Sequence, residues 1–150
     1  MKPNMQQKLL LQLKDKTVFS LAQEYAMSYL DDALERPVFP AQDALDLLSK
    51  FDEAIPVSST EPKDILNQLH TYGSPATVST LGGRYFGFVT GSALPIGLAT
   101  KHLATYWDQA PAMYVLSPIS SKLEAVVEKW LIELFNLTKR TCAEFVSGTS

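Results

Sequence analysis

Residues 117–137, with the sequence SPISSKLEAVVEKWLIELFNL, form the most regular pattern in the chain. Lysine and glutamate side chains occupy one face of the expected helix, and apolar side chains recur at helical spacing on the other. Ser117 is a favourable N-cap, and Pro118 suits the first helical position. The stretch therefore predicts one unbroken amphipathic helix, whose apolar stripe consists of Leu123, Val126, Val127, Trp130, Leu131, Leu134 and Phe135.

The segment that follows this helix, AEFVSGTS, occupies residues 143–150. Residues 143–146 are small or apolar and include a β-branched and an aromatic side chain, so they predict a buried strand. A glycine and small hydroxyl residues directly after a strand are typical of a phosphate-binding turn at the start of a helix. The pattern places such a turn at residues 147–150.

The N-terminal half of the chain is dominated by a helical pattern over about residues 7–35, which Pro37 and Pro40 bring to an end. We expect one long amphipathic helix there. Its apolar stripe is not covered by any other pattern in the chain, so we expect the isolated chain to self-associate, to aggregate or to be partly molten. The side chains expected to stay exposed are Val18, Leu21, Tyr25 and Tyr29.

Two shorter helices are expected next, over residues 41–51 and 61–73. Ser59 or Thr60 is the expected N-cap of the second, and Gly73 is expected to lie past its end. A linker separates the two helices.

Residues 77–91, TVSTLGGRYFGFVTG, contain four glycines and three aromatic residues and fit no helical period. We expect a loop that holds a short strand over residues 85–89, with Tyr85 and Phe86 in the core. A further helix is expected over residues 93–109.

The balance is four or five helices against two short strand candidates, so the fold of these residues is expected to be mostly α. Two strands alone do not make a stable sheet, and a buried parallel strand needs neighbours on both sides. The pattern therefore indicates a piece of a larger α/β domain.

Composition excludes several classes of protein. The 150 residues carry a net charge of -3 without a basic run, which argues against nucleic-acid binding. The polar N-terminus does not resemble a signal peptide, and no stretch approaches the roughly 20 apolar residues that span a bilayer. A single cysteine agrees with a reducing compartment, so we expect a cytoplasmic protein that is not bound to a membrane.

The stretch from Leu81 to Ser150 resembles the group II pyridoxal-phosphate-dependent amino-acid decarboxylases, the family of the aromatic-amino-acid, histidine and glutamate decarboxylases. The resemblance rests on elements in order: RYFGFVTG, a proline soon after it, the SP helix start, LE within that helix, a tryptophan, and a strand leading into Gly-Thr-Ser. It implies the N-terminal part of an α/β fold-type-I transferase-like fold. Residues 1–80 would be a helical segment that wraps the partner in a homodimer, and residues 81–150 would begin the large cofactor-binding domain.

The resemblance also implies site residues. Gly148, Thr149 and Ser150 match the turn that holds the phosphate of pyridoxal 5'-phosphate. Phe88 and Thr90 match positions that line the pocket of the amino-acid substrate, often from the partner subunit. For these two residues the alternative is an aromatic side chain packed under a loop beside a turn threonine.

The family's cofactor-stacking histidine, its aspartate at the pyridine nitrogen and its Schiff-base lysine have no match in the 150 residues. The resemblance therefore implies a portion of a decarboxylase that is truncated at the phosphate turn, is inactive by itself and binds the cofactor only weakly. The alternative is a protein of another class, a non-catalytic helical interaction or remnant protein that keeps the dimer-forming surface.

The remaining reactive side chains favour structural roles, so no catalytic residue and no metal site is predicted. Lys101 is expected on a solvated helix face, and His70 is expected to cap a helix or to be solvated. His102 has no second ligand at metal spacing. Cys142 is expected to be buried or half-buried.

Overall fold

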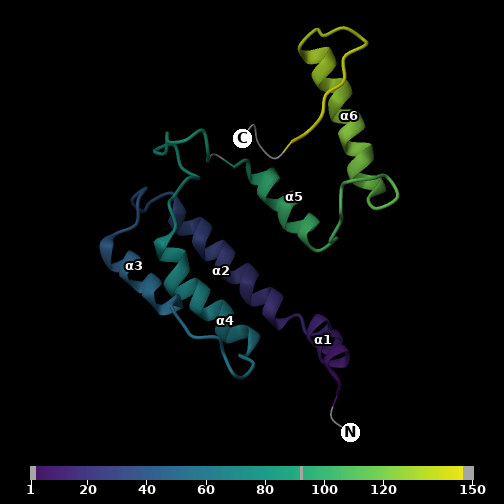
Figure 1. Cartoon of the computed structure of the whole chain (residues 1–150). Coiled ribbons are helices and arrows are strands. Elements are labelled where there is room, and N and C mark those ends of the chain that lie inside the picture. The colour runs from purple at the N-terminus through teal and green to yellow at the C-terminus, as the bar shows by residue number, and fades with distance from the viewer. Residues whose placement is uncertain (1–2, 92, 147–150) are drawn as a thin grey trace. The chain divides into compact units, whose positions relative to one another are not determined.

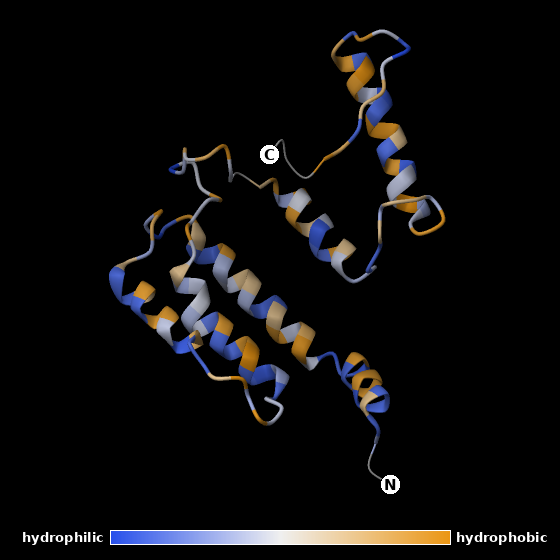
Figure 2. Cartoon of the chain, viewed as in Figure 1, coloured by the Kyte–Doolittle hydropathy of each residue, from blue (hydrophilic) through white to orange (hydrophobic). Residues whose placement is uncertain are grey.

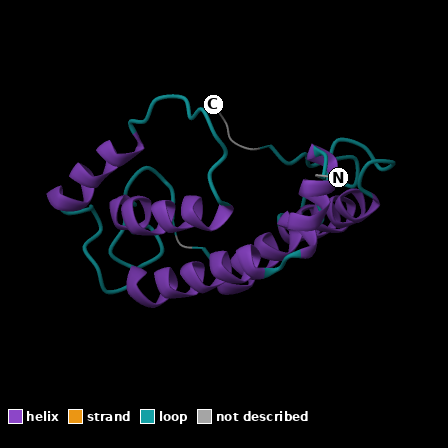
Figure 3. Ribbon diagram, turned by 90° about the horizontal axis from the view of Figure 1, so that it is seen from below, coloured by secondary structure: helices purple, strands orange, loops and turns teal. Residues whose placement is uncertain are grey.

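The computed structural model describes residues 3–91 and 93–146, which consist of helices and loops (Figures 1 and 3). The expectation of a mostly α fold is confirmed. The chain divides into two compact units, Met1–Ala93 and Leu94–Ser150. The helical elements are α1 (Met5–Lys14), α2 (Thr17–Ala33), α3 (Gln42–Asp46), η1 (Leu47–Phe51), α4 (Pro62–Gln68), η2 (Leu69–Gly73), η3 (Ser74–Ala76), α5 (Pro95–Thr105) and α6 (Pro118–Leu134).

Helix α1 begins with a capping box. The Oδ1 atom of Asn4 accepts a hydrogen bond from the Gln7 N–H at 2.9 Å, and the Gln7 side chain accepts one from the Asn4 N–H at 3.0 Å. Two N–H groups that a helix start leaves unpaired are thereby satisfied. Every residue of α1 is exposed, including its leucines.

A break at Asp15 and Lys16 separates α1 from α2, so the expectation of one helix over residues 7–35 is wrong. Asp15 has an extended backbone, and its Oδ1 atom accepts a hydrogen bond from the Thr17 N–H at 3.0 Å. That backbone bond, followed by a hydrogen bond with the Thr17 side chain, holds the pKa of the Asp15 carboxyl below its ordinary value. The chain breaks here because a short acidic side chain competes with the helix for backbone donors.

Helices α2 and α4 pack against each other within the first unit (Figure 1). The Tyr25 hydroxyl donates to Asn67 Oδ1 at 2.6 Å, and the Tyr25 ring stacks on the His70 ring with centroids 3.9 Å apart. The two rings are inclined by only 4°. A hydrogen bond and a ring stack thus join side chains more than 40 positions apart in the sequence.

The apolar stripe of α2 is covered in part by this packing. Its four expected members are half-buried, so the expectation that they stay exposed is wrong: Val18, Leu21, Tyr25 and Tyr29. Helix α4 covers part of the stripe because the chain reverses direction through α3, η1 and the following linker, which brings α4 beside α2. Exposed apolar residues remain on α1 and, within α2, at Met27 and Leu30.

Arg36, just after α2, connects this helix to the helical turns η2 and η3 that follow α4. Its guanidinium donates to the carbonyl oxygens of Ser74 at 3.0 Å and Thr77 at 2.6 Å, and it lies 4.8 Å from the centre of the Tyr29 ring. The Tyr29 hydroxyl in turn lies 2.9 Å from Thr77 Oγ1. Charge-assisted bonds to carbonyls at a helix end are among the stronger polar contacts of a protein.

The helix expected over residues 41–51 is present as α3 followed by η1, and the helix expected over residues 61–73 starts and ends differently from the prediction. Glu61 is its N-cap residue rather than Ser59 or Thr60, and it makes no side-chain cap bond. Pro62 explains this, because proline favours the first helical position and so fixes the cap one residue before itself. Gly73 does not lie past the end, since η2 and η3 continue the helical turns to Ala76.

In the second unit, α5 confirms the helix expected within residues 93–109, and α6 confirms an unbroken helix through residues 123–134. Ser117 is its N-cap, as expected: the Ser117 Oγ atom, fully buried, accepts from the Ser120 N–H at 3.4 Å. Figure 2 shows both apolar and polar residues along the whole of α6, as expected of a helix that has one face of each kind. Val126, Val127 and Leu131 are half-buried, whereas Trp130 and Leu134 are exposed.

Helix α6 ends three residues earlier than expected, at a Schellman motif. Asn136 has φ = 50°, and its N–H donates to Glu133 O at 3.0 Å. The Leu137 N–H donates to Ile132 O at 2.9 Å, which completes the 6→1 bond of this motif. Asparagine tolerates the left-handed conformation better than most residues, so Asn136 stops the helix.

Neither expected strand is present among the described residues. Within 85–89, Phe88 and Val89 have positive φ angles of 54° and 55°, which are incompatible with an extended strand. Within 143–146, the Ala143 N–H bonds to a side-chain oxygen of Glu128 at 3.3 Å instead of to a second strand. A strand depends on a neighbour for its backbone bonds, and residues 3–91 and 93–146 offer these segments none.

None of the helices in the described part of the chain combines the length and apolarity that a bilayer crossing requires.

Candidate functional site

The residues expected to bind the cofactor phosphate, Gly148, Thr149 and Ser150, lie outside the described residues. The two expected substrate-pocket residues, Phe88 and Thr90, lie in the first unit on the segment 80–91, called here the aromatic loop. The loop follows the helical turns of η3 and is the candidate site within the described residues.

The root of the aromatic loop is anchored by Ser79. The Ser79 hydroxyl donates to the Ala33 carbonyl at the end of α2, and the Ser79 N–H donates to Val38 O at 2.9 Å. Ser79 and Ala33 are both buried, in a unit with few buried side chains. These bonds fix the point at which the loop leaves the helices.

A second anchor comes from Arg84, inside the loop. The Arg84 guanidinium donates through Nη2 to the carbonyl oxygens of Leu34 and Arg36, at 2.5 Å and 2.8 Å. Leu34 is the C-cap of α2, and α2 has no basic residue in its own last turn. Arg84 therefore brings a positive charge to the end of α2, where the helix dipole favours one.

Two glycines allow the loop to close around Tyr85. A Cβ atom at Gly91 would lie 2.5 Å from the Thr80 carbonyl oxygen, and the φ of Gly91 is +102°. A Cβ atom at Gly87 would lie 3.1 Å from the Tyr85 hydroxyl oxygen. The Thr90 hydroxyl donates to the same oxygen at 3.2 Å, so both ends of the loop meet the half-buried Tyr85.

The tip of the loop is a tight turn that presents apolar side chains to solvent. The Thr90 N–H donates to Gly87 O at 3.3 Å, and both residues between them, Phe88 and Val89, are left-handed. Phe88 is 94% exposed and Phe86 is 91% exposed. The expectation that Phe86 lies in the core is wrong, and Phe88 is not packed under its own loop.

The arrangement offers binding but little acid–base chemistry. An exposed aromatic tip can fill an apolar pocket of another surface, and the nearby hydroxyls of Tyr85 and Thr90 can orient a polar group. A left-handed β-branched residue such as Val89 is costly and persists only where its surroundings hold it. Strained positions of this kind gather at binding sites.

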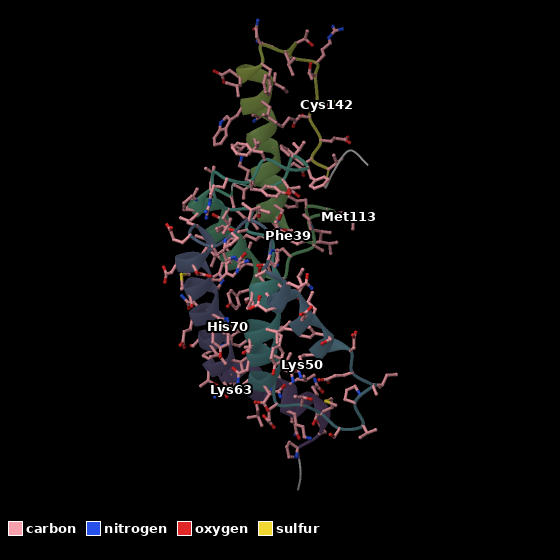
Figure 4. All side chains as sticks on the ribbon, turned by 90° about the vertical axis from the view of Figure 1, so that its left-hand side faces the viewer. Phe39, Lys50, Lys63, His70, Met113 and Cys142 are labelled. Atoms are coloured by element: carbon pink, nitrogen blue, oxygen red, sulfur yellow. The ribbon has the colours of Figure 1, made fainter. Side chains whose placement is uncertain are left out.

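The other reactive side chains differ in their surroundings; His70 and Cys142 are labelled in Figure 4. His70 neither caps a helix nor is solvated: it is half-buried against Tyr25, and its Nδ1 atom is buried without a partner. Cys142 is exposed, so the expectation of burial is wrong. Lys101 lies on an exposed face as expected, and His102 packs edge-on against Tyr106.

No group of acidic, histidine and cysteine side chains in the described residues could hold a metal ion. A shallow depression of about 390 Å³ lies at the start of α2 beside α4, lined by Lys16, Thr17, Ser20, Leu21, Glu24 and Lys63. At this helix start, Asp15 already accepts a hydrogen bond from the Thr17 N–H.

Sequence reasoning missed Arg36 and Arg84, the two side chains that organise the loop and its base. Neither belongs to a local motif, and each binds carbonyl groups about 40 to 50 positions away. A backbone carbonyl gives no signal in a sequence, so no pattern could have found these contacts.

The chain is similar to the L-tyrosine/L-DOPA decarboxylase 2 of Lophophora williamsii. The two are 27% identical over 93 residues, which make up 62% of this chain and 18% of the relative. The chain thus matches less than a fifth of the length of this curated relative. No family model matches the chain, and no solved structure matches it. The similarity supports a decarboxylase-like origin.

Proposed function

We propose that the chain is the N-terminal portion of a pyridoxal-phosphate-dependent L-amino-acid decarboxylase. The observation that carries the proposal is the similarity over 93 residues to a tyrosine/DOPA decarboxylase. The ordered motifs between Leu81 and Ser150 indicate the same class of enzyme from the residues themselves.

The helical region fits a role in assembly. In the proposed enzyme, residues 1–80 wrap the partner subunit of a homodimer, and residues 81–150 open the cofactor-binding domain. Helix α1 supports this role, because Leu9, Leu10 and Leu13 are exposed on a capped, regular helix. A second copy of the chain is a partner that would remove such side chains from water.

The aromatic loop fits a role in substrate binding. Phe88 and Thr90 would line the pocket of the amino-acid substrate from across the subunit boundary, and the exposure of the loop tip supports this. The aromatic side chains of the loop tip, once packed against the substrate, would exclude water from the carboxylate that is removed.

The cofactor would be held by Gly148, Thr149 and Ser150. Their hydroxyl and backbone N–H groups form a donor set that suits a phosphate. Pyridoxal phosphate, when bound, supplies an electron sink for the bond that breaks. No lysine of the chain matches the residue that would bind the cofactor covalently, so we propose that the 150 residues alone bind it weakly and do not decarboxylate amino acids.

A non-catalytic interaction protein is the second candidate, and the exposed leucines of α1 together with the exposed loop aromatics favour it. Such a protein would use the same surfaces without a cofactor. The two candidates differ in what the complete coding sequence adds to these residues.

The decisive experiment uses the product of the full-length transcript that contains this sequence. It is purified with pyridoxal phosphate, and release of CO₂ from L-tyrosine, L-DOPA and L-glutamate is measured. We expect cofactor-dependent release from at least one of these substrates. A folded product that binds no cofactor and releases no CO₂ from any of these three substrates would refute the proposal and favour the interaction protein.

A companion experiment uses the 150-residue chain alone. It is mixed with pyridoxal phosphate, treated with borohydride and mapped by peptide mass. We expect no stoichiometric labelling. Complete labelling of one lysine would contradict the proposed dependence on residues outside the chain.

A further inference from the structure

Two arginines in the first unit each neutralise the carboxyl end of a helical segment that is distant in sequence. Arg36 binds the carbonyl groups of Ser74 and Thr77 after η2, and Arg84 binds those of Leu34 and Arg36 after α2. The Arg84 side chain therefore binds the backbone carbonyl of Arg36, and the Arg36 side chain binds the carbonyls of Ser74 and Thr77. The two contacts connect α2, the end of the α4 region and the aromatic loop.

The geometry of the loop makes its tip depend on this connection. Ser79 fixes where the loop starts, but Ser79 lies nine positions from Phe88. Between them, Arg84 makes the side-chain bonds that join the loop to the helices. The remaining hydrogen bonds shown for the loop, between Thr90 and Tyr85 and across the Gly82–Tyr85 and Gly87–Thr90 turns, are internal to it, so Arg84 supplies the polar contacts that join the described part of the loop to the helices.

We propose that Arg84 is a positioning residue, whose bonds to the end of α2 hold the aromatic loop in one orientation and so determine where Phe88 and Val89 are presented. The inference rests on the proposed function for the ligand of the loop tip, namely the apolar part of an amino-acid substrate pocket. Arg84 itself touches no substrate. It acts by limiting the motion of a loop whose tip is backbone-strained.

The strain at the tip gives a reason for such an anchor. Phe88 and Val89 both hold left-handed φ angles, and such residues relax to extended conformations unless their surroundings prevent it. Without the Arg84 bonds, the described loop would keep only its internal hydrogen bonds, so the turn could open and relax these angles. A binding loop held in place before it meets its ligand loses less freedom on binding.

The test compares Arg84→Gln and Arg84→Lys with the unmodified 150-residue chain. Chymotrypsin cleavage after Phe86 and Phe88 reports the mobility of the tip, and hydrogen exchange of the Ser79 amide reports the root. Thermal unfolding and exchange of the α2 and α4 amides report the helices. Arg140→Gln, at an exposed arginine of the other unit, is the matched control.

We expect Arg84→Gln to speed cleavage at the tip about tenfold, as the loss of bonds from a charged donor allows, with helix exchange unchanged. Arg84→Lys, which keeps the charge and one donor nitrogen with three N–H groups, should restore most of the resistance. Arg140→Gln should change nothing. The assay needs no cofactor, so it can fail or succeed independently of the proposed decarboxylase activity.

Two results would overturn the proposal. Unchanged cleavage in Arg84→Gln would show that the loop is held by its internal contacts. An equal loss of protection in the loop, α2 and α4 would show that Arg84 stabilises the whole unit and does not position the loop.

Discussion

The contact between Tyr25 and the side chains of α4 predicts a graded loss of stability in two variants. Tyr25→Phe removes the hydrogen bond to Asn67 but keeps the ring, whereas Tyr25→Ala removes both the hydrogen bond and the stack on His70. Comparing the two separates the polar part of the contact from the aromatic part.

The magnitudes follow from the geometry. A neutral hydrogen bond in a partly exposed place contributes about 0.5 to 1 kcal/mol, which is the expected cost of Tyr25→Phe. The ring stack adds about 0.5 to 1.5 kcal/mol, and half-burial of the ring adds about 1 kcal/mol. Tyr25→Ala should therefore cost about 2 to 3.5 kcal/mol in the free energy of unfolding.

The assay is thermal unfolding of the full chain followed by circular dichroism, with Tyr114→Ala as a control at an exposed tyrosine of the other unit. For a unit of this size, a loss of 1 kcal/mol lowers the midpoint by about 4 to 8 °C. We expect a fall of about 2 to 8 °C for Tyr25→Phe and about 8 to 28 °C for Tyr25→Ala. In the background of Asn67→Ala, Tyr25→Phe should cost nothing further.

Equal midpoints for Tyr25→Ala and Tyr114→Ala would refute the reasoning, because they would show that α2 and α4 do not rely on this contact. Equal losses for Tyr25→Phe and Tyr25→Ala would assign the whole effect to the hydrogen bond and none to the stack.

Three further predictions concern single features. Asn136→Ala should lower the thermal midpoint of the helical signal by the equivalent of about 1 kcal/mol, and Asn136→Gly should not, because alanine resists the left-handed conformation; equal effects would contradict this explanation. Folding lowers the pKa of the Asp15 carboxyl, so the stabilisation that this carboxylate provides is present above the ordinary carboxyl pKa and is lost as pH falls through the pKa of the folded state. The Thr17 amide, which donates to Asp15, should therefore lose protection from hydrogen exchange on acidification. Asp15→Asn should abolish that pH dependence. Leu9→Gln with Leu13→Gln should shift the chain from an associated to a monomeric species in sedimentation at micromolar concentration, because both leucines are exposed on α1; an unchanged distribution would exclude α1 as the contact surface.

Helix α6 shows where sequence reasoning succeeds. Its cap, its first-turn proline and its apolar stripe lie within one continuous stretch, and the structure confirms the cap, the proline and the unbroken helix through the stripe. Its end was predicted three residues late, although Asn136 was a readable stop signal. The break before α2 was readable as well, since Asp15 stands two residues before a threonine whose N–H it binds.

The expected strands and the aromatic residues expected in the core show where sequence reasoning fails. Residues 85–89 have the composition of a strand, yet strand formation requires a neighbouring backbone that composition cannot guarantee. Phe86 resembles a core residue by type, and only its place on a loop closed by Gly91 puts it in solvent. The aromatic loop was identified as the candidate substrate-binding segment from its motif, but its anchors were not.

By itself, the sequence determined the helical class, most helix positions and the motif of the aromatic loop, because these depend on propensity, capping and periodicity among residues that are close along the chain. The tertiary structure alone decided that α4 covers the stripe of α2, that His70 stacks on Tyr25, and that Arg84 and Arg36 tie the loop to the helix ends. These contacts join side chains to rings or backbone carbonyls some 40 to 50 positions away. Their partners carry no local signature, and only the path of the folded chain brings them within bonding distance.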